Sequence, residues 1–209
     1  ELIVTVAGLV RTAVQDATTA LVTADLTIAE RVISGDARID ELTKEIEQRS
    51  FQLLARQAPV AGELRTVVAV LRMSYSLDRM GDLAAHIAKI ARLRYPEVAA
   101  PEPIADQIKQ MAETADSMIA TAITTLENRD AEAAAGLATA DSKMDELRSD
   151  QFHLLLSDDW EYGVEKAVDT ALLGRYYERI ADHAVAMGAR TIYIVTGEAP
   201  EGENWPSSF

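Results

Sequence analysis

Cysteine is absent from this 209-residue chain, so disulfides and thiolate metal sites are excluded. Any metal site must therefore use oxygen or imidazole ligands. Aromatic residues make up only 5% of the sequence, and ten glycines and six prolines leave few positions for loops. Alanine, leucine, glutamate and arginine, all strong helix formers, are abundant instead, which predicts an all-α protein.

Basic charge and long apolar runs are also scarce. The formal net charge is −14, and nucleic-acid binding normally needs a basic face, so nucleic acid is not an expected partner. Direct adhesion to anionic lipid is disfavoured for the same reason. No uncharged stretch approaches the roughly 20 residues of a membrane-spanning helix. The chain begins at Glu1 rather than at methionine, so a targeting segment ahead of it is not excluded, and the cytoplasm is the default expectation.

Apolar residues recur at helical spacing in six segments, with a break between each pair. The expected helices cover about 1–23, 26–57, 59–94, 104–126, 131–156 and 160–195. Asp25 and Asp130 are expected N-caps, and Gly197 is an expected C-cap. Three prolines between Tyr95 and Pro103 indicate a linker. The sequence therefore predicts a three-helix unit over 1–97, a second over 103–198 and a C-terminal tail over 199–209.

The two halves repeat one pattern. The string DARIDEL at 36–42 matches DSKMDEL at 141–147, a shift of 105 from position 36 to position 141. The string DRMGD at 78–82 matches ERIAD at 178–182, a shift of 100 from 78 to 178. A period this long indicates a duplicated domain rather than a solenoid, whose repeats are roughly 20–50 residues. The expected fold is two tandem three-helix bundles related by internal duplication.

Each matching string contains two acids four residues apart. On a helix this spacing turns both carboxylates the same way, one turn apart, where a cation can bridge them. A single pair carries little weight, because 34 acids in 209 residues give about five such pairs by chance. Recurrence in both halves is what distinguishes these four pairs from a solvated acidic face.

The helical wheel adds a direction to the pattern. Asp78 and Asp82 extend the line of Leu64, Val68 and Tyr75, so they are expected to point into the bundle. Partly buried carboxylates must protonate, pair with a base or bind a cation. Arg79 and Arg179 point about 100° away from the neighbouring acids and are not expected to neutralise them. Oxygen-rich sites of this kind suit magnesium, calcium, manganese or iron, and zinc also fits.

These residues resemble the PhoU family of phosphate-uptake regulators over nearly the whole chain. The resemblance is carried by the paired acid motifs, by LLARQAPVA at 53–61 followed by ELR at 63–65, and by YERIADH at 177–183. It implies clusters of metal ions, most often iron or zinc, held by these motifs. The implied ligands are Asp36, Asp40, Asp78 and Asp82 in the first unit, and Asp141, Asp145, Glu178 and Asp182 in the second. Asp78 stands where the family often has glutamate.

The resemblance also implies a function. Such proteins are cytoplasmic negative regulators that couple a phosphate ABC transporter, through its ATPase, to a sensor histidine kinase. They dampen the phosphate-starvation response. A homodimer is expected, and contact with the membrane is expected only through partners. No catalytic residues are implied, so the chain is expected not to be an enzyme.

Two other functions remain open from the residues themselves. A carboxylate-bridged di-iron oxidase would need Glu-x-x-His motifs, and the nearest string, Asp150 to His153, is not repeated. A metal-free helical adaptor needs no site at all. Among the other histidines, His86 lies four residues beyond Asp82 and could reach it, whereas His183 is expected to hydrogen-bond within the bundle.

Overall fold

The computed structural model of the chain describes residues 1–100, 102 and 104–198. Within these residues all regular structure is helical. The six helices are α1 (Leu2–Thr23), α2 (Leu26–Gln57), α3 (Ala61–Arg94), α4 (Ile104–Asn128), α5 (Ala131–Leu155) and α6 (Gly163–Thr196). The all-α prediction is thus confirmed, while the predicted tail 199–209 and linker residues Pro101 and Pro103 lie outside the described residues.

Three predicted helix ends are confirmed by their capping geometry. The Asp25 and Asp130 side chains accept hydrogen bonds at 2.9 Å from the backbone N–H groups of Ile28 and Ala133. Each bond satisfies an N–H group that has no partner within the first turn of its helix. Gly197 ends α6 with a φ of 82°, the left-handed conformation that glycine adopts at lowest cost.

Two helix starts differ from prediction. The third helix begins at Ala61 rather than at Pro59 or Val60, because Ala61 itself has a φ of 47° and the chain is still turning there. The last helix begins at Gly163 rather than near Trp160. The Trp160 indole N–H donates to the Gly163 carbonyl at 2.9 Å. Residues 160–163 therefore form a turn that leads into the helix.

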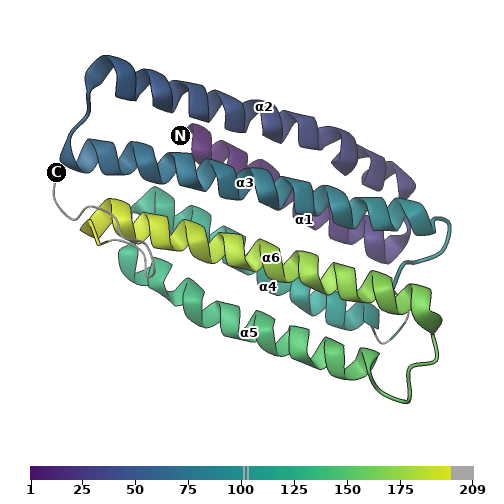
Figure 1. The fold of residues 1–209 in the computed structure, drawn as a ribbon. Coiled ribbons are helices and arrows are strands. Elements are labelled where there is room, and N and C mark those ends of the chain that lie inside the picture. Colours follow the sequence, from purple (N-terminus) through teal and green to yellow (C-terminus); the bar gives the residue numbers. More distant parts are fainter. Residues whose placement is uncertain (101, 103, 199–209) are drawn as a thin grey trace.

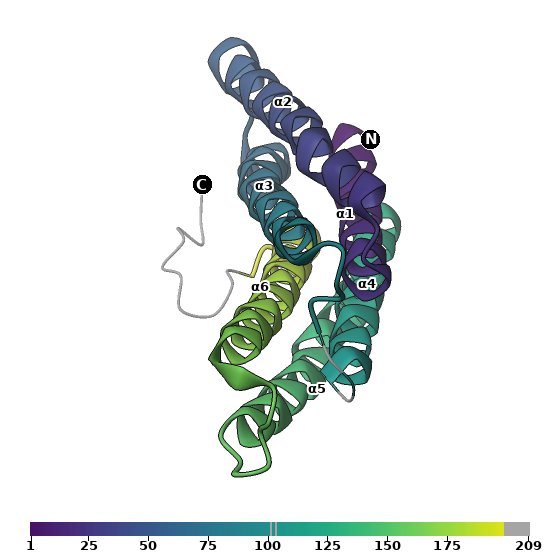
Figure 2. The same cartoon turned by 90° about the vertical axis from the view of Figure 1, so that its right-hand side faces the viewer.

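The helices form four successive layers, which Figure 2 shows from one side: α2, then α1 with α3, then α4 with α6, then α5. Within each repeat the three helices pack on one another, and the repeats meet through α1 against α4 and α3 against α6. The inner four helices therefore share one core, and α2 and α5 cover its two outer sides. This arrangement agrees with two tandem three-helix bundles. No helix in the described part of the chain is both long enough and apolar enough to cross a membrane.

The core includes many small and unbranched side chains. Ala7, Ala17 and Ala84 are fully buried, as are Met80 and Met111. Alanine lets helix backbones approach closely, and methionine fills the irregular gaps that remain. The abundance of alanine thus has a packing role in addition to its helix propensity.

Polar contacts also cross between the repeats. The fully buried Tyr177 of α6 has its hydroxyl 2.7 Å from the Thr18 hydroxyl of α1, which satisfies the phenol where water cannot reach it. Arg94 at the end of α3 donates to both Asp169 carboxylate oxygens, at 2.5 and 3.1 Å, and also pairs with Glu165. The hydrogen bond to Asp169 is the main cause of the raised pKa of Arg94.

We expect Asp169→Ala to lower the free energy of unfolding by about 2–4 kcal/mol, because it leaves Arg94 without its buried partner. The Asp169 side chain is only 7% exposed, so water cannot replace the lost carboxylate. Asp106→Ala is the matched control, since its pair with Lys109 is exposed and should be worth less than about 0.5 kcal/mol. Urea unfolding followed by circular dichroism measures both, and equal losses in the two variants would contradict the assignment.

Candidate metal centres

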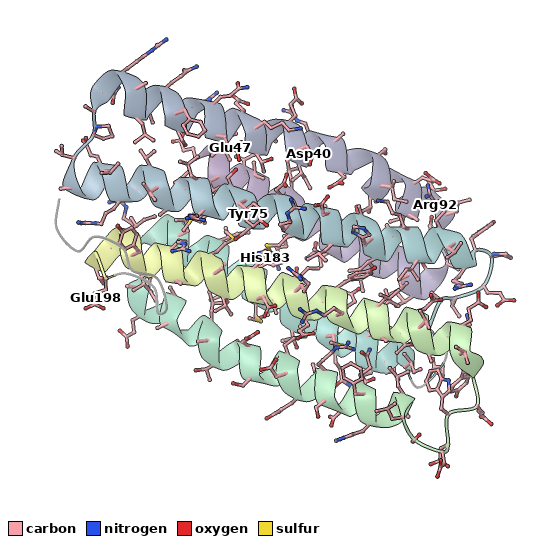
Figure 3. All side chains as sticks on the ribbon, in the orientation of Figure 1. Asp40, Glu47, Tyr75, Arg92, His183 and Glu198 are labelled. Atoms are coloured by element: carbon pink, nitrogen blue, oxygen red, sulfur yellow. The ribbon has the colours of Figure 1, made fainter. Side chains whose placement is uncertain are left out.

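The eight acids predicted as ligands form two groups, one in each repeat. The pKa shifts of Asp36 and Asp78 arise partly from the other acids of the first repeat, and those of Asp141 and Asp182 from the other acids of the second. The first cluster consists of Asp36 and Asp40 from α2 with Asp78 and Asp82 from α3. The second cluster consists of Asp141 and Asp145 from α5 with Glu178 and Asp182 from α6. Figure 3 labels Asp40 on α2.

Asp36 is the least satisfied member of the first cluster. Its Oδ1 atom is buried and has no hydrogen-bond partner. A methyl group added at Gly81 of α3 would lie 3.1 Å from this oxygen and 3.2 Å from Ile39, so the glycine lets α2 come close to α3 here. Burial first, and then repulsion by the neighbouring aspartates, raises the pKa of Asp36.

Asp78 is half-buried and accepts a hydrogen bond from a neighbouring helix. The Thr43 hydroxyl of α2 donates to Asp78 Oδ1 at 3.2 Å, and the Ser74 hydroxyl donates to the Thr43 carbonyl at 3.2 Å. Burial raises the pKa of Asp78, the bond from Thr43 opposes this, and the charges of Asp40 and Asp82 raise it further. The fold therefore holds like charges close together in this cluster, at a cost in electrostatic free energy.

The predicted inward direction of the third-helix acids is wrong in part. The line that they were expected to extend is not the buried face of α3, because Tyr75 on that line is 55% exposed. Helix α3 packs against three helices, and its buried face is centred on Met73, Leu77 and Met80. Asp78 and Asp82 lie at the edge of that face, where water reaches part of each side chain.

The expectation that Arg79 leaves the acids unpaired is also wrong. Its Nη1 atom donates to Asp82 Oδ2 at 2.8 Å. The two residues are three positions apart, and the long guanidinium side chain bends back across the helix surface to reach the carboxylate. Both side chains are more than a third exposed, so the pair contributes little stability.

The second cluster has more basic neighbours. Glu178 forms an ion pair with Arg175 at 2.7 Å. Arg148 Nε lies 3.4 Å from the other carboxylate oxygen of Glu178. Burial raises the pKa of both Asp141 and Asp182, and repulsion among the cluster's acids adds to this. Arg148 was not among the predicted residues. Its position directly after the repeated DEL string could have pointed to it.

His86 and His183 lie next to cluster acids but are not among the predicted ligands. His86 uses Nδ1 to contact the Asp82 backbone carbonyl at 2.7 Å, and its ring packs on Tyr176 of α6 with centroids 5.5 Å apart. His183 lies at the seam between α3 and α6, where Figure 3 labels it. Burial, with the nearby charges of Arg179 and Arg79, lowers the pKa of His183 and keeps the ring neutral.

The donor set suits a hard cation, because every cluster member offers carboxylate oxygens. The orphaned Asp36 oxygen and the mutual repulsion in the first cluster are features that a bound cation would relieve. In the conformation described, no three histidine, aspartate or glutamate side chains within the described residues are arranged so that they could hold a metal ion. Side-chain rotation would therefore have to accompany binding, and the eight ligand assignments stay predictions.

Known proteins resemble the chain over nearly its full length. The PhoU domain family matches residues 3–91 and 108–191. The phosphate-specific transport system accessory protein PhoU homolog 1 of Mycobacterium leprae is 42% identical over 201 residues, which cover 96% of this chain and 90% of the relative. PhoU homolog 2 of Mycobacterium tuberculosis is 44% identical over 193 residues, covering 92% and 91%.

Solved structures agree with these relatives. The crystal structure of PhoU from Pseudomonas aeruginosa superposes with a TM-score of 0.89 at 26% identity, covering 94% of this chain and 95% of that one. The phosphate transport system regulatory protein PhoU from Streptococcus pneumoniae superposes with a TM-score of 0.85, also at 26% identity.

We expect Asp36→Asn to stabilise the metal-free protein at neutral pH. The raised folded-state pKa of Asp36 means that, above the ordinary value of 3.8, the folded chain holds a proton that the unfolded chain has lost. The stability contributed by the protonated carboxyl is present below that value and lost as the pH rises through the folded-state pKa. The variant should gain stability at pH 7 and progressively less toward pH 4, as measured by urea unfolding in a chelator.

Asp116→Asn is the control with the opposite sign. A bidentate pair with Arg11, at 2.8 Å for both bonds, lowers the pKa of Asp116. The carboxylate therefore stabilises the fold at neutral pH, and that stability is lost as the pH falls below the ordinary value of 3.8. If both variants changed stability in the same direction at pH 7, the electrostatic account of the first cluster would fail.

Proposed function

The chain belongs to the PhoU family, as its sequence resemblance predicted, and we propose that it is a regulatory accessory protein of a phosphate-specific transport system. In this role it would act as a negative regulator, as an adaptor between the ATPase of the phosphate transporter and a sensor histidine kinase. The observation that carries the proposal is the match of both repeats, over more than nine-tenths of the chain, to relatives that are named transport accessory proteins.

The proposed role is regulatory rather than catalytic. The relatives are named accessory proteins of a transport system, and their names do not describe an enzyme. We place the chain in the cytoplasm, where both proposed partners present their soluble parts. Contact with the membrane would then be through those partners, and a homodimer is part of the same proposal.

We further propose that the acidic clusters bind multivalent cations, with iron or zinc favoured over manganese, magnesium and calcium. The support is electrostatic. Burial and like charge raise the pKa of carboxyls in both clusters, and Asp36 holds a buried oxygen without a partner. A bound cation would supply positive charge that offsets this repulsion and would link the two helices of each cluster. Asp36 and Asp40 would hold it from α2, and Asp78 and Asp82 from α3.

A metal-free helical adaptor is the second candidate. The ion pair between Arg79 and Asp82, and the two arginines on Glu178, show that the chain can neutralise part of each cluster by itself. The oxidase alternative has less support. Asp150 and His153, its nearest motif, are both exposed on α5.

We expect Asp40→Asn with Asp78→Asn to remove tightly held metal from the first cluster, because the variant loses two of its four ionised oxygen ligands. Elemental analysis of purified protein measures the metal bound per chain. Glu41→Gln with Glu45→Gln is the matched control, since these acids are also four residues apart on α2 and pair with Arg38 and Arg49 instead. Native protein without metal, or equal loss in both variants, would favour the metal-free adaptor.

The regulatory role is tested separately in cells. We expect deletion of the gene to raise the activity of a phosphate-starvation reporter several-fold in phosphate-rich medium, and the intact chain to restore repression. The immobilised chain should also retain the transporter ATPase and the sensor kinase from solubilised membranes. A reporter that is unaffected by deletion, together with retention of neither protein, would overturn the adaptor proposal while leaving cation binding to be judged by the elemental analysis.

A further inference from the structure

The two acidic clusters differ at a buried position that lies beside one of their acids. The shift of 105 that relates Asp36 to Asp141 also relates Thr43 to Arg148. Both residues contact the same acid of their cluster: Thr43 donates to Asp78 at 3.2 Å, and Arg148 Nε lies 3.4 Å from Glu178. The first repeat thus places a neutral hydroxyl where the second places a positive charge.

Arg148 is held inside the protein rather than on its surface. Its side chain is 10% exposed, its guanidinium lies over the Phe152 ring with its central carbon 4.0 Å from the ring centroid, and Nη1 donates to the buried Gln151. Its Nε atom is buried and makes no hydrogen bond. The same atom forms the ion pair with Glu178, at 3.4 Å. The stacked and buried environment fixes the charge beside the cluster.

Gly174 provides the space for this arrangement. The shift of 100 that relates Asp78 to Glu178 relates Ser74 to Gly174. A methyl group at Gly174 would lie 1.8 Å from Gln151 Oε1 and 2.6 Å from Arg148 Nη1, which excludes every larger residue while those side chains stay in place. Serine at position 74 meets no such conflict, because the smaller Thr43 faces it and accepts its hydrogen bond. The glycine therefore makes room for the Gln151 and Arg148 side chains together.

The charge around the equivalent acids follows from this difference. Asp78 has no basic side chain within ion-pair distance among the described residues, and Arg79 pairs instead with the more exposed Asp82. Glu178 has two basic partners, one on each oxygen, from Arg175 and Arg148. Arg175 stands at the position that corresponds to Tyr75, which carries no charge.

We propose that Arg148 is a built-in counter-ion of the second acidic cluster, and that it makes the first cluster the tighter of the two cation sites. This inference rests on the proposed binding of multivalent cations to the clusters. A cation that enters the second cluster must approach a fixed guanidinium and compete with it for Glu178. Even with an effective dielectric of about 20, this repulsion weakens binding by at least about tenfold.

The experiment measures manganese binding to each cluster separately, by calorimetric titration of the full chain with Mn²⁺. Asp141→Asn with Asp145→Asn leaves the first cluster as the site, and Asp36→Asn with Asp40→Asn leaves the second. We expect the first cluster to bind Mn²⁺ at least about tenfold more tightly. Equal affinities, or tighter binding by the second cluster, would overturn the inference and leave the proposed cation binding intact. Absence of binding by both would contradict the cation-binding proposal itself.

Arg148→Gln then tests the cause in the chain whose first cluster is disabled. Removing the charge should strengthen Mn²⁺ binding at the second cluster by about tenfold or more, whereas Arg148→Lys, which keeps the charge, should leave it weak. If Arg148 served packing alone, Arg148→Gln would not strengthen Mn²⁺ binding, or Arg148→Gln and Arg148→Lys would strengthen it equally.

The reciprocal exchange keeps the test independent of the folding of those variants. Thr43→Arg with Ser74→Gly, made in the chain whose second cluster is disabled, transfers the arrangement to the first repeat. It should weaken Mn²⁺ binding at the first cluster by about tenfold, and unchanged affinity in the folded variant would contradict the inference.

Discussion

The antiparallel packing of α3 against α6 is the contact on which the rest of the molecule depends. It joins the two repeats, and it fixes the helices that supply half of each acidic cluster. The register of the seam is held by the tilted ring contact of His86 with Tyr176, and at the end of α3 by the buried pair of Arg94 with Asp169. Because α3 and α6 cannot turn freely about their axes, their acids must face α2 and α5 from the edge of the buried surface.

Each outer helix completes a cluster at an electrostatic cost. Acids four residues apart on one helix already repel, and facing pairs from two helices add to the repulsion. The first repeat offsets this cost in part, through the exposed pair of Arg79 with Asp82 and the nearby charge of Lys89. It also brings α2 close to α3 at Gly81. The second repeat reduces it with arginines. Duplication therefore preserved the acids while the residues around them changed, which is how one fold can present two sites of different charge.

Much of the fold follows from local sequence signals. Asp25 and Asp130 define helix starts because an N-cap depends only on the residue and its own backbone. The spacing of the acidic pairs predicted that both acids of a pair point the same way, since a separation of four residues fixes the common direction of two side chains on a helix. The helix starts near Pro59 and Trp160 were less accurate, because turn geometry there depends on a left-handed residue and on an indole contact.

The composition and spacing of the residues were enough to establish a duplicated all-α chain whose halves carry matching carboxylates, because both properties are encoded within single helices. The surroundings of those carboxylates are a different matter. The exposure of Tyr75 and the burial of Arg148 depend on which helices pack against each face, and at what distance. Those distances were set by Gly81 and Gly174, whose importance emerges only when a second helix lies against them.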